Sequence, residues 1–233
     1  EAPVVARPRR IEGVAEAARL GADCVLLDDG FQHRALARDV DIVLVAAEQW
    51  RGNCRLLPRG PLREPPRALK RADLVIVTRK VAVAAEAERI AAELREYTSA
   101  AIGVVHLRSD RLIRAGGVGK GASITLEELR GRDIVAVTSL AEPEIVLEQL
   151  RSAGARVRSL VYPDHHPFGE RDLREIAAHA RGAPIVITSK EAVKLRHRLP
   201  PEVDILVMEQ TVEMEGGGEA FERMVTAVTG PPE

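Results

Sequence analysis

Two adjacent carboxylates, Asp28 and Asp29, directly follow the apolar run of residues 24–27. This places them at the carboxyl end of a predicted buried strand, where open α/β sheets bind their ligands. Neighbouring carboxylates repel each other unless a cation or a hydrogen-bond donor offsets their charge. In phosphoryl transfer that offset is usually Mg²⁺, which also binds phosphate oxygens. The pair therefore predicts a magnesium site, and the alternative is a simple Asp-Asp-Gly turn.

The elements that must position this pair follow an alternating pattern. Most apolar runs are continuous, which is typical of strands buried on both faces of a parallel sheet. Amphipathic helical stretches separate them, and this alternation indicates an α/β fold with right-handed crossovers. The predicted strands are residues 24–27, 41–45, 74–78, 134–138, 157–161, 185–188 and 205–208, and the predicted helices are 11–20, 83–97, 144–153, 170–180, 190–199 and 219–228.

Residues 102–123 interrupt the alternation. Residues 102–115 predict a β-hairpin around the turn Ser109-Asp110, and the glycine-rich stretch 116–123 follows it. A hairpin and glycines between two βα arrays are typical of an inter-domain connection. We therefore predict a core domain over residues 1–101, a hairpin and Gly-rich linker over 102–123, and a smaller α/β domain over 124–233.

The composition excludes several classes of protein. Of the 233 residues 45% are apolar, which indicates a globular fold. The 34 basic and 35 acidic side chains nearly cancel, whereas non-specific nucleic-acid binding requires an excess of positive charge. Two cysteines give neither a disulfide framework nor a zinc spacing, and they suit a reducing compartment. No apolar stretch approaches the roughly 20 residues that span a bilayer. The chain begins with Glu1 rather than Met, so a preceding segment could carry an anchor or a targeting signal.

A pair of histidines is the second candidate for chemistry. His165 and His166 follow Pro163-Asp164. A histidine can transfer protons or orient a base near neutral pH. The alternative is a turn in which Asp164 accepts a hydrogen bond from the backbone.

Two groups of cations could face an anionic ligand or only solvent. The segment 57–66 contains four prolines and is predicted to be a stiff loop that carries Arg63. Its Arg63-Glu64 pair could equally be a surface ion pair of little energetic value. Lys190 and Lys194 stand one helical turn apart and could face a phosphate or a solvated helix surface.

A phosphate loop of the form G-x-x-x-x-G-K-[ST] does not occur in these 233 residues. The stretch GGVGKG, residues 116–121, fails because Gly121 follows Lys120 and because Arg114 stands where the first glycine is required. It also follows a predicted hairpin rather than a buried parallel strand. We interpret it as a flexible turn.

Four segments resemble the tetraacyldisaccharide 4'-kinase family. Residues 28–45 (DDGFQHRALARDVDIVLV) are similar to its acidic-strand motif, and residues 52–78 to its Gly-Asn…Leu-Leu-Pro-x-Gly-Pro-Leu-Arg-Glu-Pro segment. Residues 162–168 (YPDHHPF) resemble its Pro-Asp-His-His box, and 188–195 (TSKEAVKL) its Thr-x-Lys-Asp-Ala-Val-Lys-Leu segment. Four matches in the family's order are far more specific than any one of them.

The resemblance implies a P-loop-type core without its first strands and a smaller Rossmann-like domain, with the ATP site between them. It implies an enzyme, a lipid kinase that uses ATP and Mg²⁺ to phosphorylate the 4'-hydroxyl of tetraacyldisaccharide 1-phosphate, giving lipid IVA in lipid A biosynthesis. The expected location is the cytoplasmic face of the bacterial inner membrane, reached through an N-terminal part, and no nucleic acid is expected as a partner. Because the family's phosphate loop lies in that N-terminal part, the chain alone is expected to be inactive.

The resemblance also implies roles for single residues. Asp28 and Asp29 would hold Mg²⁺ and order the active site. His165, favoured over His166, would support the carboxylate that activates the sugar hydroxyl. The residues expected in the nucleotide or substrate cleft are Gln32, His33, Arg10, Asn53 and Arg63.

The second domain departs from the family pattern. Residues 138–150 keep Pro143 but lack the glycines and the aromatic residue of the usual Gly-Ile-Gly-x-Pro-x-x-Phe, and Ser189 and Glu191 also differ. Two rival interpretations stay open. One is a catalytically dead module that binds an acylated sugar or a partner enzyme. The other is a nucleotide-sugar or glycosyl transferase with two Rossmann-like halves, which also uses carboxylates at strand ends.

Overall fold

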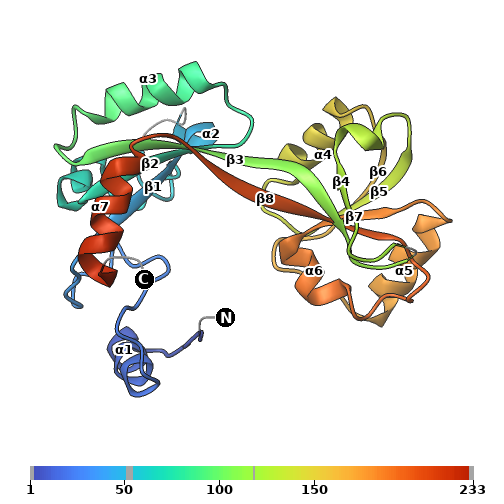
Figure 1. Cartoon of the computed structure of the whole chain (residues 1–233), viewed down its shortest axis with the longest axis horizontal. Coiled ribbons are helices and arrows are strands. Elements are labelled where there is room, and N and C mark those ends of the chain that lie inside the picture. The colour runs from blue at the N-terminus through green and yellow to red at the C-terminus, as the bar shows by residue number, and fades with distance from the viewer. Residues whose placement is uncertain (1–2, 51–54, 118, 231–233) are drawn as a thin grey trace. The chain divides into compact units, whose positions relative to one another are not determined.

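A computed structural model of the chain describes residues 3–50, 55–117 and 119–230 (Figure 1). The chain forms two compact units. Unit 1 contains Glu1–Leu107 and Val212–Glu233, and unit 2 contains Arg108–Thr211. Both units are built from mostly parallel strands and helices, so the predicted α/β fold class is confirmed.

Unit 1 has the strand order β1-β2-β3-β8, in which β1, β2 and β3 run parallel. The chain enters and leaves the unit through long strands, since only the first part of β3 and the last part of β8 belong to it. The strands are β1 (Ile42–Ala46), β2 (Leu74–Arg79), β3 (Ala101–Arg114) and β8 (Ile205–Gly216), and the helices are α1 (Arg10–Arg19), α2 (Ala47–Trp50), α3 (Ala84–Leu94), α7 (Gly218–Thr229) and a short 3-10 helix (Pro66–Arg71).

Strand β2 is the centre of this unit because its continuous Leu-Val-Ile-Val run is buried on both faces. Val75 and Val77 pack with the apolar stripe of α3, which includes Ile90. Leu74 packs on the other face, where the side chains of α7 gather. Figure 1 shows α3 and α7 covering opposite faces of these strands. Burial on both faces is the reason that the run is continuous rather than alternating.

Strand β1 is less covered than its sequence predicts. Its Leu44 side chain is 65% exposed, and Leu26, in the run that precedes the acidic pair, is 95% exposed. The prediction of a strand over residues 24–27 is wrong, since this stretch forms no strand and Cys24 lies in a bend. Backbone groups form a strand only when a neighbour completes the hydrogen-bond ladder, and within the described residues β2 is the only strand beside β1.

Unit 2 has the strand order β8-β7-β5-β6, with the short strand β4 antiparallel to the second part of β3. Two apolar clusters cover opposite faces of the parallel strands. One includes Phe168 and Ile176, and the other includes Leu147 and Leu150. The remaining elements are β4 (Ser123–Thr125), β5 (Asp133–Thr138), β6 (Arg156–Val161), β7 (Ile185–Thr188), α4 (Pro143–Ser152), α5 (Glu170–Ala180), α6 (Ser189–Leu195) and a 3-10 helix (Glu127–Leu129).

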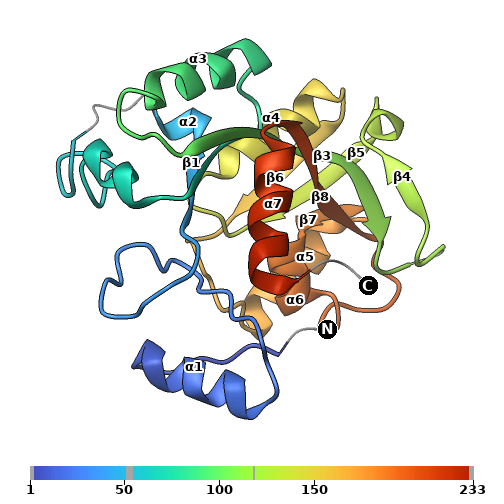
Figure 2. The same ribbon diagram turned by 60° about the vertical axis from the view of Figure 1, so that its left-hand side comes forward.

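The predicted hairpin over residues 102–115 is wrong, because one continuous strand, β3, occupies this region. Its first part pairs with β2 and its second part pairs with β4. The backbone therefore continues as a strand through Ser109 and Asp110 instead of turning. Strands β3 and β8 run side by side and both pass from one unit to the other (Figure 2). The structure therefore divides differently from the sequence-based assignment, because α7 lies in unit 1 rather than in the smaller domain.

The turn before α7 explains one glycine. Gly217 has φ +77°, and a Cβ atom there would lie 2.5 Å from the Cα of Gly103 on β3. Two backbones approach this closely only where neither residue carries a side chain. The other predicted strands and helices are confirmed, although α3 and α6 are shorter and β8 is longer than predicted. The described residues of the GGVGKG stretch form a turn, as predicted. This turn leads into strand β4 rather than into a helix.

Candidate functional site

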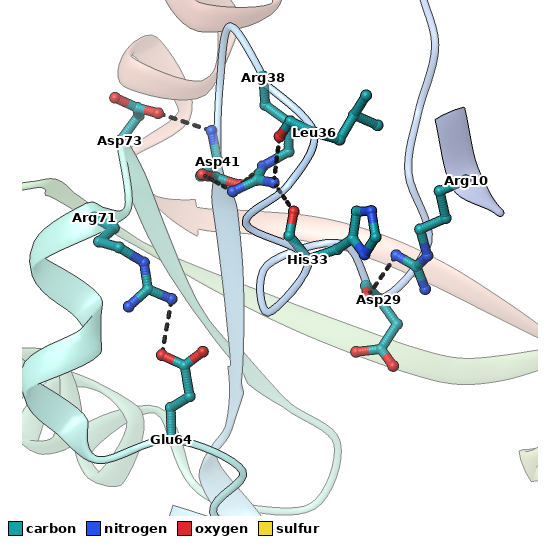
Figure 3. Close-up of polar contacts among 9 residues, drawn as sticks. All are labelled: Arg10, Asp29, His33, Leu36, Arg38, Asp41, Glu64, Arg71 and Asp73. Atoms are coloured by element: carbon teal, nitrogen blue, oxygen red, sulfur yellow. Dashed lines mark hydrogen bonds and ion pairs between the residues drawn. The ribbon is translucent and has the colours of Figure 1, made fainter. Parts of the chain in front are cut away.

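The acidic motif of unit 1 centres on Asp29, which two arginines hold from different sides. Asp29 lies in a turn with φ +51°. Arg10 donates from Nη1 to the Asp29 carbonyl oxygen at 2.9 Å (Figure 3). Arg63, from the proline-rich segment, donates to both carboxylate oxygens of Asp29. Three residues that the sequence assigned to one site are therefore in direct contact.

The contact with Arg63 stabilises the ionised form of Asp29. The hydrogen bond from Arg63 lowers the pKa of the Asp29 carboxyl below its usual value of 3.8, and the charges of Arg63 and Arg10 act in the same direction. Both partners are about half exposed, so solvent screens the pair and it adds little to fold stability. The pair orients the Asp29 carboxylate toward Arg63.

The loop after the acidic pair is organised by Arg38. This side chain donates to the carbonyl oxygens of His33 at 2.6 Å and Leu36 at 2.9 Å. It also donates to both oxygens of Asp41, at 2.7 and 3.0 Å (Figure 3). The backbone N–H of Asp41 donates to Asp73, directly before β2, at 2.7 Å. The acidic motif is thereby tied to the start of β1 and β2.

The proline-rich segment is attached to the same motif. The alternative that Arg63 and Glu64 form a surface pair with each other is not what the structure shows. Arg63 contacts Asp29, whereas Glu64 accepts a hydrogen bond from Arg71 at 2.8 Å. The guanidinium of Arg71 also lies 4.4 Å from the centre of the Phe31 ring, which is within cation–π range. Sequence reasoning identified neither Arg38 nor Arg71.

These elements line a hollow of about 840 Å³ in unit 1. Asp28, Asp29, Gln32 and Arg63 are among the lining residues, together with apolar side chains from β1 and the residues before Asp28. Arg10 and His33 are not among them, although Arg10 contacts Asp29 from outside. The predicted cleft residue Asn53 lies outside the described residues.

The acidic pair is compatible with Mg²⁺ but does not form a complete protein cage. Within residues 3–50, 55–117 and 119–230, no three His, Cys, Asp or Glu side chains converge as metal ligands. Magnesium is usually held by one or two carboxylates, substrate phosphates and water, so two adjacent aspartates suffice for the protein's share. A metal ion at Asp29 would have to share or replace the contact with Arg63.

In unit 2 the carboxyl ends of β5, β6 and β7 carry the second group of candidates. The loop after β6 contains both histidines, which differ in environment. His165 is 76% exposed, with Nε2 3.7 Å from Asp164 Oδ2. His166 is 24% exposed, bonds through Nε2 to Asp172 Oδ2 at 2.9 Å and stacks on Tyr162 with ring centroids 4.9 Å apart. The His166 side chain thus packs within unit 2, whereas the His165 side chain is exposed to solvent.

Burial of Tyr162 in this loop gives a measurable consequence. Burial, together with the charges of Glu175 and Asp172, raises the pKa of the Tyr162 phenol to about 12. The pKa is raised above the unfolded value of about 10, so the stability that the neutral phenol contributes is complete below that value and is lost as the pH rises through 12. In a Tyr97→Phe variant of residues 1–233, in which Tyr162 is the only tyrosine of those residues, we expect ionisation near pH 12 in stopped-flow absorbance titrations recorded before alkaline unfolding. A midpoint near 10 would contradict the packing described here.

The carboxyl ends of β5 and β7 are joined by a carboxylate that sequence reasoning missed. Glu191, in the first turn of α6, is fully buried. Its Oε1 accepts hydrogen bonds from the backbone N–H and the hydroxyl of Ser139, both at 3.0 Å. Its Oε2 accepts from the N–H of Thr188 at 3.2 Å and from the Thr188 hydroxyl. The spacing Thr188-x-x-Glu191 is a capping-box pattern and was the available signal.

Comparison with known proteins agrees with the resemblance of the four segments. The sequence profile of a family described as tetraacyldisaccharide-1-P 4'-kinase matches residues 1–229. The tetraacyldisaccharide 4'-kinase of Anaeromyxobacter dehalogenans (strain 2CP-C) is 45% identical over 206 residues, which cover 82% of this chain and 52% of that protein. The one from Syntrophus aciditrophicus (strain SB) is 42% identical over 189 residues, covering 76% and 50%. The one from Nitrobacter winogradskyi is 35% identical over 199 residues, covering 84% and 54%.

The chain spans about half the length of the curated relatives it matches. No solved structure matches it significantly. The profile covers both units, including the acidic motif and the loop of the two histidines. This chain belongs to the tetraacyldisaccharide-1-P 4'-kinase family.

Proposed function

We propose that the protein containing this chain transfers the γ-phosphate of ATP to the 4'-hydroxyl of tetraacyldisaccharide 1-phosphate, giving lipid IVA in lipid A biosynthesis. The observation that carries the proposal is the family match over residues 1–229. The ionised Asp29, held by Arg10 and Arg63 beside a hollow of about 840 Å³, supports it.

In this proposal unit 1 supplies the phosphate side of the reaction. Asp28 and Asp29 would hold Mg²⁺, which neutralises charge on the phosphate oxygens when bound. Arg63 would orient the Asp29 carboxylate. Gln32, which lines the hollow, would contact the nucleotide or sugar. His33, Arg10 and Asn53 stay predictions as cleft residues.

In unit 2, His165 would orient the carboxylate that takes the proton of the attacking 4'-hydroxyl. Its exposed imidazole can donate a hydrogen bond, whereas that of His166 is engaged by Asp172. A histidine that orients a base also tunes the pKa of that base. Because the His165 side chain is already exposed, this orienting role requires no rearrangement within unit 2.

The acylated substrate places the reaction at a membrane surface, and we propose the cytoplasmic face of the inner membrane. None of the helices in the described part of the chain is long and apolar enough to cross a bilayer. A peripheral contact made by the whole protein would be sufficient for a kinase whose acceptor is a lipid headgroup.

A rival proposal, a nucleotide-sugar transferase with two Rossmann-like halves, requires a nucleotide site in unit 2. Such sites lie where the strand order reverses, between the loops after β5 and β7. The Glu191 carboxylate lies between those loops, bonded to Ser139 and Thr188. The backbone and hydroxyl donors of Ser139 and Thr188 are therefore bonded to Glu191 rather than free to bind a phosphate.

The proposal is tested by phosphate transfer from γ-labelled ATP. The complete gene product is expected to label the disaccharide lipid in a reaction that requires Mg²⁺. Residues 1–233 alone are expected to label nothing, because they contain no G-x-x-x-x-G-K-[ST] backbone cradle for the phosphates. A complete protein that hydrolyses ATP but never labels the lipid would favour the binding-module interpretation. Activity of residues 1–233 at enzyme-like rates would require GGVGKG to be reconsidered.

A further inference from the structure

The loop that carries His165 contains two residues with left-handed backbone conformations, which need contacts from outside the loop to stabilise them. His165 has φ +60°, and Phe168 has φ +50° although its side chain is bulky and buried. Left-handed conformations are uncommon for residues other than glycine, above all for bulky ones, and they persist only where the surroundings fix them. The contacts that fix this loop therefore determine where the His165 side chain points.

Two lysines of α6 contact the residues on either side of His165 in the sequence, Asp164 and His166. Lys190 donates from Nζ to Asp164 Oδ1 at 3.0 Å, and the same oxygen accepts the backbone N–H of His165 at 3.0 Å. Lys194 donates to the carbonyl oxygen of His166 at 3.0 Å. The lysines are four residues apart, so they lie on one face of the helix, and both point to this loop.

Glu191, between them in sequence, reaches the loop through Ser139. One carboxylate oxygen accepts the Thr188 N–H, which is the part of the capping box that Glu191 supplies. The other holds the N–H and the hydroxyl of Ser139, whose carbonyl oxygen accepts the His165 N–H at 3.3 Å. Burying a carboxylate is costly unless donors surround it, and here four donors do.

We propose that α6 is the positioning element for His165: Lys190, Glu191 and Lys194 hold the 162–168 loop in the conformation that projects the His165 imidazole outward. None of the three is a catalytic residue in this account, because each acts through the loop. The inference rests on the proposed role of His165 for its kinetic consequence, but its structural part does not.

The lysine contacts are separable from the fold of unit 2. Helix α6 is anchored to the core by Ala192 and Leu195, which are buried, and the lysine side chains are partly exposed. Lys190→Met and Lys194→Met keep the aliphatic stems while removing the ammonium donors. The double variant is therefore expected to fold. Arg196→Met, which removes an exposed cation just beyond α6, is the matched control.

The structural test is hydrogen exchange measured by mass spectrometry on the complete gene product. In the lysine double variant, exchange in residues 162–168 is expected to rise roughly tenfold, since two charge-assisted hydrogen bonds to the loop are lost. Exchange in α5 and β7 is expected to stay unchanged, as it should everywhere in Arg196→Met. Unchanged exchange in the loop of the double variant would overturn the proposal.

The kinetic test uses the same variants with and without His165. The double variant is expected to lower kcat roughly tenfold with an unaltered KM for ATP, because misplacing a positioned group by about 1 Å can cost as much as 10²-fold. In a His165→Ala background the lysine substitutions are expected to lower kcat no further, since they act through that side chain. An additional loss there would show that the lysines do something other than position His165 and would overturn the inference.

Glu191 is tested with conservative substitutions because it is buried. Glu191→Asp keeps a carboxylate and is expected to retain most of the rate, whereas Glu191→Gln places an amide N–H₂ against the donors of Ser139 or Thr188 and is expected to behave like the lysine double variant. Equal effects of Glu191→Asp and Glu191→Gln on kcat and on loop exchange would contradict the requirement for a group whose two oxygens both accept hydrogen bonds. If His165→Ala itself leaves kcat unchanged, the catalytic proposal for His165 fails, while the exchange measurement still decides whether α6 holds the loop.

Discussion

Asp29→Ala is expected to lower kcat of the complete protein by roughly 10³-fold or more. The reason is that a charged group at a phosphoryl-transfer site stabilises mainly the transition state. The structure adds that Asp29 is ionised and held by two arginines rather than buried in a core. Loss of the carboxylate itself is therefore expected to cost little stability, and any fall in the melting temperature of Asp29→Ala is expected to come from backbone strain at φ +51°. Initial rates at varied Mg²⁺ concentration, with thermal melts of the same samples, measure both effects.

The left-handed backbone of Asp29 calls for a second variant. Alanine disfavours φ +51°, whereas asparagine tolerates it and has the same shape as aspartate. Asp29→Asn is thus expected to lose the rate as fully as Asp29→Ala without backbone strain. Asp23→Ala, which removes an exposed carboxylate ahead of the motif, is the control and is expected to retain the rate. A near-normal rate in Asp29→Asn would remove this residue from the mechanism.

His165→Ala is expected to lower kcat by about 10²-fold with little change in the KM for ATP, which is the range of a group that assists proton transfer. Because the side chain is largely exposed, the melting temperature is expected to fall only by the small strain that alanine adds at φ +60°. Steady-state kinetics with ATP varied at saturating lipid separate kcat from KM.

His166→Ala is the matched comparison and is expected to show the opposite pattern. It removes the bond to Asp172 and the stacking on Tyr162, so the melting temperature is expected to fall while kcat changes less. Equal losses of kcat in the two variants would restore the interpretation of this segment as an ordinary turn. The same conclusion would follow if His165→Ala only lowered the melting temperature.

Much of the fold follows from local patterns in the sequence. Continuous apolar runs marked β2, β5 and β7 because these strands are buried on both faces. The same pattern failed at residues 24–27, where an apolar run has no strand beside it within the described residues. The predicted turn at Ser109-Asp110 also failed, because whether the backbone turns there depends on pairing with strands that are distant in the sequence. Apolarity reports how well a segment can be buried, whereas pairing is decided elsewhere in the chain.

The candidate site was predictable where residue type alone indicates chemistry. Asp28, Asp29 and the histidine pair were named as candidates from their side chains, and the preference for His165 stays a prediction. The contacts that organise them could not be identified in this way. Arg38 and Arg71 are ordinary charged residues in sequence, and only folding brings them to His33 and Phe31. Glu191 left a capping signal that explains one of its oxygens but not the one that reaches Ser139.

The most direct test of the central claim is the position of the phosphate on the product. The complete protein, ATP, Mg²⁺ and tetraacyldisaccharide 1-phosphate would be incubated and the lipid examined by phosphorus–proton correlation NMR. We predict a new phosphate monoester that correlates with the proton at the 4' carbon, and none in the Asp29→Asn reaction. A phosphate on another hydroxyl, no new phosphate with the unaltered protein, or an undiminished 4'-phosphate with Asp29→Asn would contradict the account.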